Sequence, residues 1–470
     1  MKYYPTIGLE VHAELKTRTK MFCDSLNDPD EKHPNVNVCP VCLGHPGTLP
    51  VANKKAVESV IKIGLALGGM PNTECRFDRK NYFYPDLPKA YQISQSGKPI
   101  ISGGILRNVK INHIHLEEDA GKLVHDDASG GTLVDFNRAS VPLMELVTEP
   151  DIHTAEEAVA FMKDLQLILR YLDVSDADLE RGQMRADANI SVSATDKLGT
   201  RAEVKNLNSF RSVFQAINYE IKRQTEILEK GETVYQETRG WDEAKQKTTS
   251  QRSKEEAQDY RYFPEPDLPP FTTDIFDIEK LRDELPELPA PRVARFQKEY
   301  ALESAQAELL VGEPALAEFF EDAVSELRAD APNASASTLY NYLTSDLRGL
   351  MNEAGISFGY IKIKPEHLAH LASLVDGGKI MSRQAKDMLA KMFDTGLDPE
   401  DIMKSENIGI SDEGEIEAVV LAVIAENKAA VDDYKKGKTA SLQFLIGKAM
   451  GILNGRARPD MLKEIFEKNL

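Results

Sequence analysis

The chain has 470 residues, too many for a single hydrophobic core, and this length indicates about three domains. A hydrophobic content of 41% and a charged content of 28% are ordinary for a folded protein, and no apolar run approaches the roughly 20 residues that span a bilayer. The net charge of −19 excludes a protein that coats nucleic acid indiscriminately but allows a local basic surface. Because the first residues lack the apolar core of a signal peptide, we expect a cytoplasmic protein.

Residues 6–15 predict the first strand. Apolar and polar residues alternate from Ile7 to Val11, which is the period of a half-buried strand. Glu10 and His12 therefore project from the same face, where a carboxylate and an imidazole can share a metal ion or orient one another. A solvent-facing polar edge is the alternative.

The chain contains four cysteines, Cys23, Cys39, Cys42 and Cys75. The two-residue spacing between Cys39 and Cys42 lets both thiolates reach one tetrahedral Zn²⁺, and the other two can complete a closed structural site. A redox pair at Cys39 and Cys42 is the alternative, but the flanking prolines and glycines do not resemble the strand-to-helix junction of a thioredoxin motif. We therefore expect structural zinc.

The stretch 77–95 is dense in aromatic residues, prolines and basic residues. Pro85 and Pro88 prevent a regular element, so we expect a shaped loop. Aromatic faces between cations can stack a base or sugar and neutralise phosphates, although aromatic packing in the core is the alternative. The candidate cofactor-binding residues are Arg79, Lys80, Tyr82 and Lys89.

Residues 113–125 combine three consecutive acids with three histidines and Lys122. If the first half is a strand, alternation places His115 and Glu117 on one face and Glu118 on the other. Hard oxygen ligands, imidazoles and an ammonium in one short stretch indicate a site for Mg²⁺ and phosphate. A polar hairpin edge with solvated charges is the alternative.

Two later stretches repeat the pattern of the first strand. Asp187 and Asn189 share a face of one predicted strand, and Glu203 and Lys205 share a face of the next. Several strands that each present a pair of polar groups predict the walls of a common polar cleft. So many acids on one surface would repel one another unless cations lay between them.

The rest of the chain is predicted to be helical. Helices are expected over 54–68, 154–172 and 209–230, the second with a capping box at Thr154 and Glu157. A run of prolines from Pro264 to Pro291 ends the first domain. Shorter amphipathic helices follow over 315–327, 336–351, 365–375 and 382–394. We predict an α+β protein with a mixed or antiparallel sheet domain at 1–292, an all-α domain at 293–405 and a small all-α tail at 406–470.

The tail differs in charge from the rest of the chain. From Tyr434 onward eight lysines and arginines face three acids, which predicts a phosphate-binding surface in an otherwise acidic protein. Ordinary solvated lysines are the alternative. The candidate nucleic-acid-binding residues are Lys435, Lys436, Lys438, Arg456 and Arg458.

Long runs of residues in the chain resemble the B-subunit family of the bacterial aspartyl/glutamyl-tRNA amidotransferases. The matching runs are Ile7-Gly-Leu-Glu-Val-His12, Phe77 to Pro85, Lys89 to Gln95, Glu117 to Lys122, Asp187 to Ser191, Glu203 to Phe210 and Asp259 to Pro266. The resemblance covers essentially the whole chain. It implies a cradle domain at the N-terminus, a helical domain that supports the acceptor arm of a tRNA, and a tail that contacts the tRNA body.

The resemblance implies a reaction and its residues. ATP would phosphorylate the side-chain carboxylate of misacylated Glu-tRNA(Gln) or Asp-tRNA(Asn), and ammonia would displace the phosphate with the help of Mg²⁺. Glu10, His12 and Glu118 match the metal-binding positions of the family. The residues that match its cleft walls are Asp187, Asn189, Glu203 and Lys205. Because some members lack the cysteines, zinc rests on the four cysteines of this chain alone.

The resemblance also implies partners. A glutaminase A subunit would supply ammonia through an internal tunnel, and a small C subunit would join the two in a heterotrimer. Two other classes of function remain as alternatives. A free-standing carboxylate-amine ligase would turn over ATP without RNA, and a non-catalytic tRNA-binding scaffold would bind no Mg²⁺ in the acidic cleft.

Overall fold

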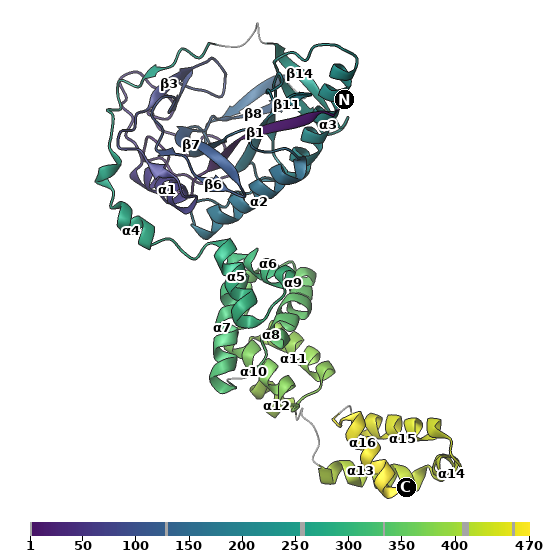
Figure 1. The fold of residues 1–470 in the computed structure, drawn as a ribbon. Coiled ribbons are helices and arrows are strands. Elements are labelled where there is room, and N and C mark those ends of the chain that lie inside the picture. Colours follow the sequence, from purple (N-terminus) through teal and green to yellow (C-terminus); the bar gives the residue numbers. More distant parts are fainter. Residues whose placement is uncertain (1, 127–129, 254–258, 332–333, 407–412, 454–455) are drawn as a thin grey trace. The chain divides into compact units, whose positions relative to one another are not determined.

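The computed structural model describes residues 2–126, 130–253, 259–331, 334–406, 413–453 and 456–470. It divides into two compact units, Met1–Pro289 and Ala290–Leu470 (Figure 1). The N-terminal unit combines a large sheet with helices, whereas the described residues of the C-terminal unit form helices and their connections. The predicted α+β class is confirmed.

The described part of the N-terminal unit forms three sheets. Its strands are β1 (Tyr4–Glu14), β2 (Met70–Pro71), β3 (Asp78–Asn81), β4 (Tyr91–Ser94), β5 (Ile101–Ser102), β6 (Ile105–Leu106), β7 (Val109–Glu118), β8 (Lys122–Asp126), β9 (Gly131–Asp135), β10 (Pro142–Thr148), β11 (Met184–Ser193), β12 (Ala202–Leu207), β13 (Glu237–Asp242), β14 (Lys247–Ser253) and β15 (Phe263–Pro264). Its helices are α1 (Lys54–Ala66), α2 (Ala155–Tyr171), α3 (Phe210–Glu229), the 3-10 turn η2 (Thr273–Ile275) and α4 (Ile278–Asp283).

The largest sheet has the strand order β14-β13-β12-β11-β1-β10-β7-β5-β2, with β6 also paired to β7. Strand β1 lies in the middle and pairs antiparallel with β10 and β11, so that Glu10 faces Val147 on one side and Asp187 on the other. Strands β12 and β13 are parallel, and the other pairs are antiparallel. Alternation along β1 therefore places all its even-numbered polar residues on one face of a rigid sheet.

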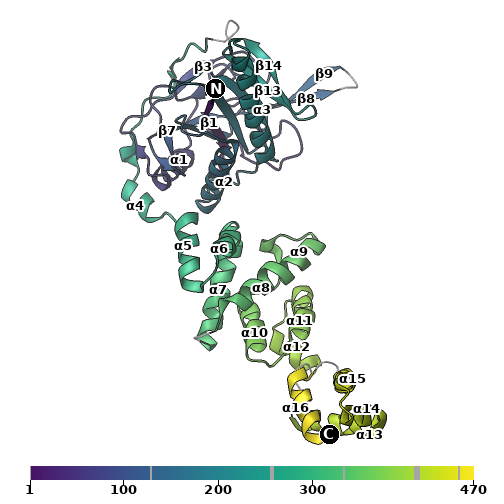
Figure 2. The same cartoon turned by 45° about the vertical axis from the view of Figure 1, so that its right-hand side comes forward.

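Helices α1, α2 and α3 cover the other face of this sheet (Figures 1 and 2). Leu9 and Val11 of β1 are buried in one core with Phe161 of α2 and Ile217 of α3. The capping box predicted at the start of α2 is present. The Thr154 hydroxyl accepts a hydrogen bond from the backbone N–H of Glu157, and the Glu157 carboxylate accepts one from the backbone N–H of Thr154. Because the helices bury one face of the large sheet, its polar side chains lie on the opposite face, where a functional site can form.

The stretch 77–95 differs from the loop expected for it. Its two ends form strands β3 and β4, which pair antiparallel with each other, and β15 adds to β3 to make a small three-stranded sheet. Pro85 and Pro88 lie in the connection between β3 and β4, where no ladder hydrogen bond is required. The prolines thus shape the connection without preventing the strands on either side of it.

The C-terminal unit consists of α5 (Pro289–Tyr300), α6 (Ser304–Val311), α7 (Pro314–Asp330), α8 (Ala336–Asn341), the π-helical turn η3 (Tyr342–Leu347), α9 (Arg348–Ala354), η4 (Phe358–Tyr360), α10 (Pro365–Asp376), α11 (Ser382–Thr395), α12 (Pro399–Glu406), α13 (Glu413–Glu426), α14 (Lys428–Lys435), α15 (Thr439–Ile452) and α16 (Pro459–Asn469). Helices α13 to α16 share a core of their own around Leu445 and Phe466. The boundary expected at 405 and 406 adjoins residues outside the described ranges and stays a prediction. None of the described helices combines the length and the apolar character that a membrane span needs.

Candidate functional site

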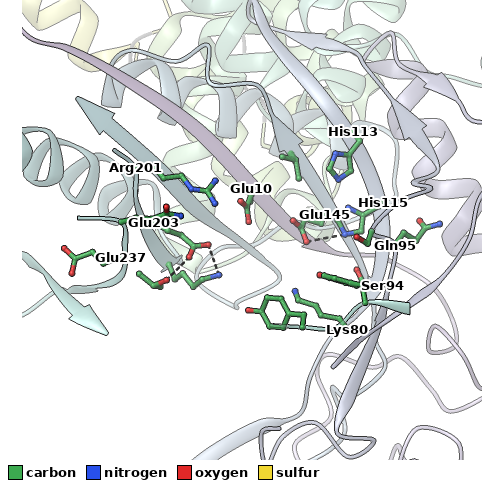
Figure 3. A pocket seen from close by; sticks show the side chains of 17 residues that line it. Glu10, Lys80, Ser94, Gln95, His113, His115, Glu145, Arg201, Glu203 and Glu237 are labelled. Carbon is green, nitrogen blue, oxygen red and sulfur yellow. Dashed lines mark hydrogen bonds and ion pairs between the residues drawn. The ribbon is translucent and has the colours of Figure 1, made fainter. Parts of the chain in front are cut away.

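A cavity of about 490 Å³ opens on the polar face of the large sheet (Figure 3). Its walls come from β1, β7, β10, β12 and β13, from β3 and β4 of the small sheet, and from the segment that precedes β15. Carboxylates, imidazoles and cations line it, and Figure 3 places Lys80 in the same pocket as Glu10, Glu145 and Glu203. Its volume is that of a small-molecule or nucleotide site.

One group of metal-ligand side chains is formed by His12, Glu117 and Glu145, whose ligand atoms all lie within 4.8 Å of one another. The Nε2 atom of His12 lies 3.2 Å from Oε2 of Glu145 and 3.7 Å from Oε1 of Glu117. His115 approaches the same Glu145 oxygen to 3.4 Å. The strand register explains the meeting, because His12, Glu145 and His115 lie directly opposite one another on β1, β10 and β7.

The charges in this group depend on one another. Burial opposes ionisation of Glu145, but His115 and His12 hold its pKa well below the usual value. Burial likewise opposes protonation of His12, and the Glu145 carboxylate overcomes it and raises the pKa of that imidazole. The Nδ1 atoms of both histidines are buried without a hydrogen-bond partner among the described residues. Two carboxylates and an imidazole nitrogen form a suitable donor set for a divalent cation.

A second group consists of Glu10, Asp187 and Glu203, whose ligand atoms also lie within 4.8 Å of one another. The ammonium of Lys205 lies between two of them, 3.1 Å from Oδ2 of Asp187 and 3.0 Å from Oε1 of Glu203. The side-chain amide of Asn189 donates to Oε1 of Glu10 over 2.9 Å. The structure therefore brings together six of the seven catalytic candidates, in two adjoining groups on one sheet face.

The acids of the second group are not fully neutralised. Burial raises the pKa of Glu10, and the carboxylates of Glu145 and Glu203 raise it further. Burial lowers the pKa of Lys205, but Asp187 and Glu203 outweigh it and raise the pKa above its ordinary value. One ammonium among this many carboxylates leaves a negative site, which favours a bound cation.

Glu118, the seventh candidate, lies apart from both groups. Its side chain is 1% exposed and accepts from the ammonium of Lys89 over 2.7 Å and from the backbone N–H of Ile93 over 2.9 Å. Strand alternation sends Glu118 to the side of β7 opposite to Glu117. The expected metal triad of Glu10, His12 and Glu118 is therefore replaced by two other groups, and Glu117 is the acid of this pair that meets His12.

Three of the four cofactor-binding candidates do not line the pocket, and each interacts with another side chain. Arg79 makes a bidentate ion pair with Glu265 at 2.6 and 2.8 Å, Lys89 pairs with Glu118, and Tyr82 bonds to Gln92. Lys80 is different, because it lines the pocket and no described residue lies within hydrogen-bond or ion-pair distance of its ammonium.

The candidate site residues did not include four residues of this pocket, although the stretch 113–125, which contains His115, was recognised as a cation site. Glu145 and His115 stand opposite His12 across two strand pairs, and Tyr260 and Tyr262 enter from the segment before β15. Glu117 could have been identified from the sequence, because alternation along β7 places Glu117, and not Glu118, on the same face as His115. No local pattern links Tyr260 to β3, because their pairing spans most of the N-terminal unit.

The cysteines form a group of three, not four. The Sγ atoms of Cys23, Cys39 and Cys42 lie within 4.8 Å of one another, whereas Cys75 is fully buried in the hydrophobic core and donates to the carbonyls of Asn72 and Pro99 over 3.6 Å. This corrects the expected four-thiolate set. A hydrogen bond with Cys23 lowers the pKa of Cys42, which favours the thiolate form of Cys42 within this group.

A buried cation accompanies the cysteine group. Lys20 is fully buried, and its ammonium lies 3.8 Å from Sγ of Cys42 and donates to the Phe136 carbonyl over 3.2 Å. Ser25 Oγ approaches the same sulfur to 3.9 Å. A buried ammonium requires a counter-charge, and the thiolate supplies it.

The basic residues of the tail are partly paired. Arg456 donates to Glu415 over 2.7 Å, Lys438 donates to Asp433 over 3.1 Å, and Arg458 lies 4.0 Å from Asp460. Lys435 and Lys436 are exposed at the end of α14. The proposed phosphate-binding surface therefore includes these two exposed cations.

Comparison with known proteins covers nearly the whole chain. Residues 5–277 match the family model described as the GatB/GatE catalytic domain, and residues 318–470 match the one described as the GatB domain. Proteins named as the B subunit of aspartyl/glutamyl-tRNA(Asn/Gln) amidotransferase from Caldicellulosiruptor saccharolyticus and Thermomicrobium roseum are each 46% identical, over 100% of this chain and 99% of their own length. The protein of that name from Thermoanaerobacter pseudethanolicus is 46% identical over 100% of both chains.

Proposed function

The chain belongs to the family of aspartyl/glutamyl-tRNA(Asn/Gln) amidotransferase B subunits, and we propose that its pocket performs the ATP-dependent part of this glutamine-dependent ligase reaction. A side-chain carboxylate oxygen of Glu-tRNA(Gln) or Asp-tRNA(Asn) attacks the γ-phosphorus of ATP, and ADP leaves. Ammonia then attacks the carbonyl carbon of the acyl phosphate. The amide bond forms, and phosphate leaves with the bonding electron pair and one proton from the ammonia.

The observation that carries this proposal is the presence of two groups of metal-ligand side chains that both reach one pocket, the first through Glu145 and the second through Glu10 and Glu203. His12, Glu117 and Glu145 would hold Mg²⁺, and Glu10, Asp187 and Glu203 would hold a second cation or share the first. When bound, Mg²⁺ would supply positive charge that neutralises phosphate oxygens.

The lysines at the pocket have separate roles. Lys205 is committed to Asp187 and Glu203, so it reduces the repulsion between these acids and fixes their positions. Asn189 orients Glu10 through its amide. Lys80 has no such partner among the described residues, and its ammonium is therefore proposed to contact the phosphate chain. Glu118, held by Lys89, supports β7 from behind the pocket.

The cysteine group is proposed to hold one structural Zn²⁺. Cys23, Cys39 and Cys42 supply three thiolates, and such an ion would cross-link a region that contains little regular structure. A divalent cation with three thiolates carries one net negative charge, which the ammonium of Lys20 would neutralise. Zinc with this donor set stabilises the fold and takes no part in the reaction.

The names of the relatives, as B subunits, support further subunits, and the identity of these subunits is part of the proposal. Nothing in the pocket resembles a glutaminase site, so an A subunit would release ammonia from glutamine, and a small C subunit would complete a heterotrimer. The basic tail, with Lys435 and Lys436 exposed, would contact the tRNA backbone.

The test combines the chain with A and C subunits, ATP, glutamine and Glu-tRNA(Gln), and measures Gln-tRNA(Gln). Glu145→Gln keeps the shape of the side chain and removes one ligand charge, so product formation should fall at least about a hundredfold. Glu156→Gln, an exposed glutamate in the first turn of α2, is the matched control and should leave the rate unchanged. Absence of product with the unmodified chain, or full activity of Glu145→Gln, would contradict the proposal.

A further inference from the structure

Two tyrosines form an aromatic wall of the pocket, here defined as Tyr260 and Tyr262. Their ring centroids are 6.0 Å apart at an interplanar angle of 66°, and Tyr82 meets Tyr260 edge to face from behind at 5.9 Å and 72°. An edge-to-face contact covers at most one face of one of its two rings, so this arrangement does not stack the two tyrosines face to face. Tyr262 is 43% exposed although it lines the cavity, so burial in a core does not explain the position of its ring.

The wall is held in place by Asn81. The backbone N–H of Asn81 donates to the carbonyl of Tyr260 over 2.9 Å, and its side-chain amide donates to the carbonyls of Arg261 at 2.9 Å and Tyr260 at 3.3 Å. Arg261 adopts a left-handed backbone conformation with φ of 43°, which is costly for a residue with a side chain. Such a conformation persists only where the surroundings enforce it, and here the three bonds from Asn81 do so.

The wall stands beside a cation and both groups of acids. The ammonium of Lys80 lies 5.1 Å from the ring centroid of Tyr260 and enters the pocket that Glu10 and Glu145 also line (Figure 3). Burial opposes its protonation, but Glu117 and other neighbours raise the pKa, so Lys80 is charged. Aromatic rings, an ammonium and metal-ligand groups around one pocket are the kinds of group that bind the base and the phosphates of a nucleotide.

We infer that the aromatic wall binds an adenine ring, with Tyr260 and Tyr262 in contact with the base and Asn81 as the residue that positions them. The inference rests on the proposed function, which brings two adenosines to this pocket: that of ATP and the 3′-terminal adenosine of the tRNA. Both offer the same neutral, planar purine. A tyrosine face stacks on it without a charged partner, which leaves Lys80 for the phosphates.

The experiment uses the full chain with its A and C subunits and determines KM for ATP and for Glu-tRNA(Gln) separately. Tyr262→Leu removes the aromatic face, and Asn81→Asp keeps the side-chain shape but loses the amide donors. If the wall holds ATP, each should raise KM for ATP about tenfold or more, with kcat changed much less. Tyr262→Phe keeps the aromatic face and should raise KM for ATP much less than Tyr262→Leu does. A rise in KM for Glu-tRNA(Gln) alone assigns the wall to the tRNA adenosine.

Two controls keep the result decisive. Tyr4→Leu, a half-exposed tyrosine outside the pocket, should leave both KM values unchanged. Equilibrium binding of a non-hydrolysable ATP analogue to the full chain needs no turnover, and Tyr260→Leu is the second variant should Tyr262→Leu not fold. The wall has no such role if the Leu variants melt normally and keep both KM values and the analogue affinity within twofold. If the unmodified complex makes no Gln-tRNA(Gln), the proposed function fails, and the analogue measurement still tests the wall.

Discussion

The ion pair between Lys89 and Glu118 provides a sharp test of how the pocket is supported. The two side chains are 11% and 1% exposed, and their charged atoms are 2.7 Å apart. Replacing lysine by methionine in Lys89→Met keeps most of the side-chain length and removes the charge. The carboxylate of Glu118 then keeps only the backbone N–H of Ile93 among its described donors to the side chain.

The expected cost follows from burial. Removing one partner of a buried pair leaves an uncompensated charge and costs about 3–5 kcal/mol in the free energy of unfolding, whereas an exposed pair contributes at most about 1 kcal/mol. The double variant Lys89→Met with Glu118→Gln contains no unpaired charge, so it should recover most of that loss.

The assay is urea unfolding followed by the fluorescence of Trp241, the single tryptophan, which lies in the N-terminal unit. A loss below about 1 kcal/mol for Lys89→Met, or a double variant no more stable than the single one, would refute the argument. The transamidation activity of the double variant is a second measurement, and it distinguishes a supporting role of Glu118 from a functional one. Recovered activity would establish that Glu118 supports the pocket, and lost activity despite recovered stability would make it a functional acid after all.

Further expected outcomes concern the metals and a buried carboxyl group. Cys42→Ser should remove zinc from the purified chain, whereas Cys75→Ser should leave the zinc content unchanged, as measured by elemental analysis; equal loss from both would contradict the three-thiolate site. Glu117→Gln should raise the Mg²⁺ concentration for half-maximal activity at least about tenfold, and an unchanged Mg²⁺ titration would refute its role as a ligand. Burial raises the pKa of Glu14 from 4.5 to about 7, so the folded state binds the proton more tightly than the unfolded state. Its contribution to stability is therefore full below pH 4.5 and is lost as the pH rises through about 7, and Glu14→Gln should flatten this part of the urea-unfolding profile.

Much of the N-terminal unit was accessible to local reasoning. The alternation in residues 6–15 predicted β1, and the same alternation put Glu10 and His12 on one face, where the structure has them. The helices at 54–68 and 154–172 were recognised from apolar periodicity and caps. These features depend on residues within a few positions of each other, so the sequence displays them directly.

The composition of the site depended on strand register, which no local pattern contains. His12 meets Glu145 because β10 pairs with β1, and a different neighbour would have offered a different acid. Cys75 fitted the cysteine count, but its distance from the other three is set by the packing of the core. Family resemblance located the cleft, alternation in β7 distinguishes Glu117 from Glu118, and strand pairing decided that Glu145 of β10 lies beside His12.

The central position of β1 also bears on how the protein is made. This strand pairs with β10 and β11, and the partners of Glu10 in those strands, Val147 and Asp187, follow it in the chain by 137 and 177 residues. At about 5–20 residues per second, a ribosome would produce those partners on the order of ten seconds or more after β1. Until then β1 lies outside the exit tunnel without the strands that pair with its backbone N–H and C=O groups. We expect nascent chains stalled before β10 to bind holdase chaperones, and chains stalled well beyond β12 to be released from them.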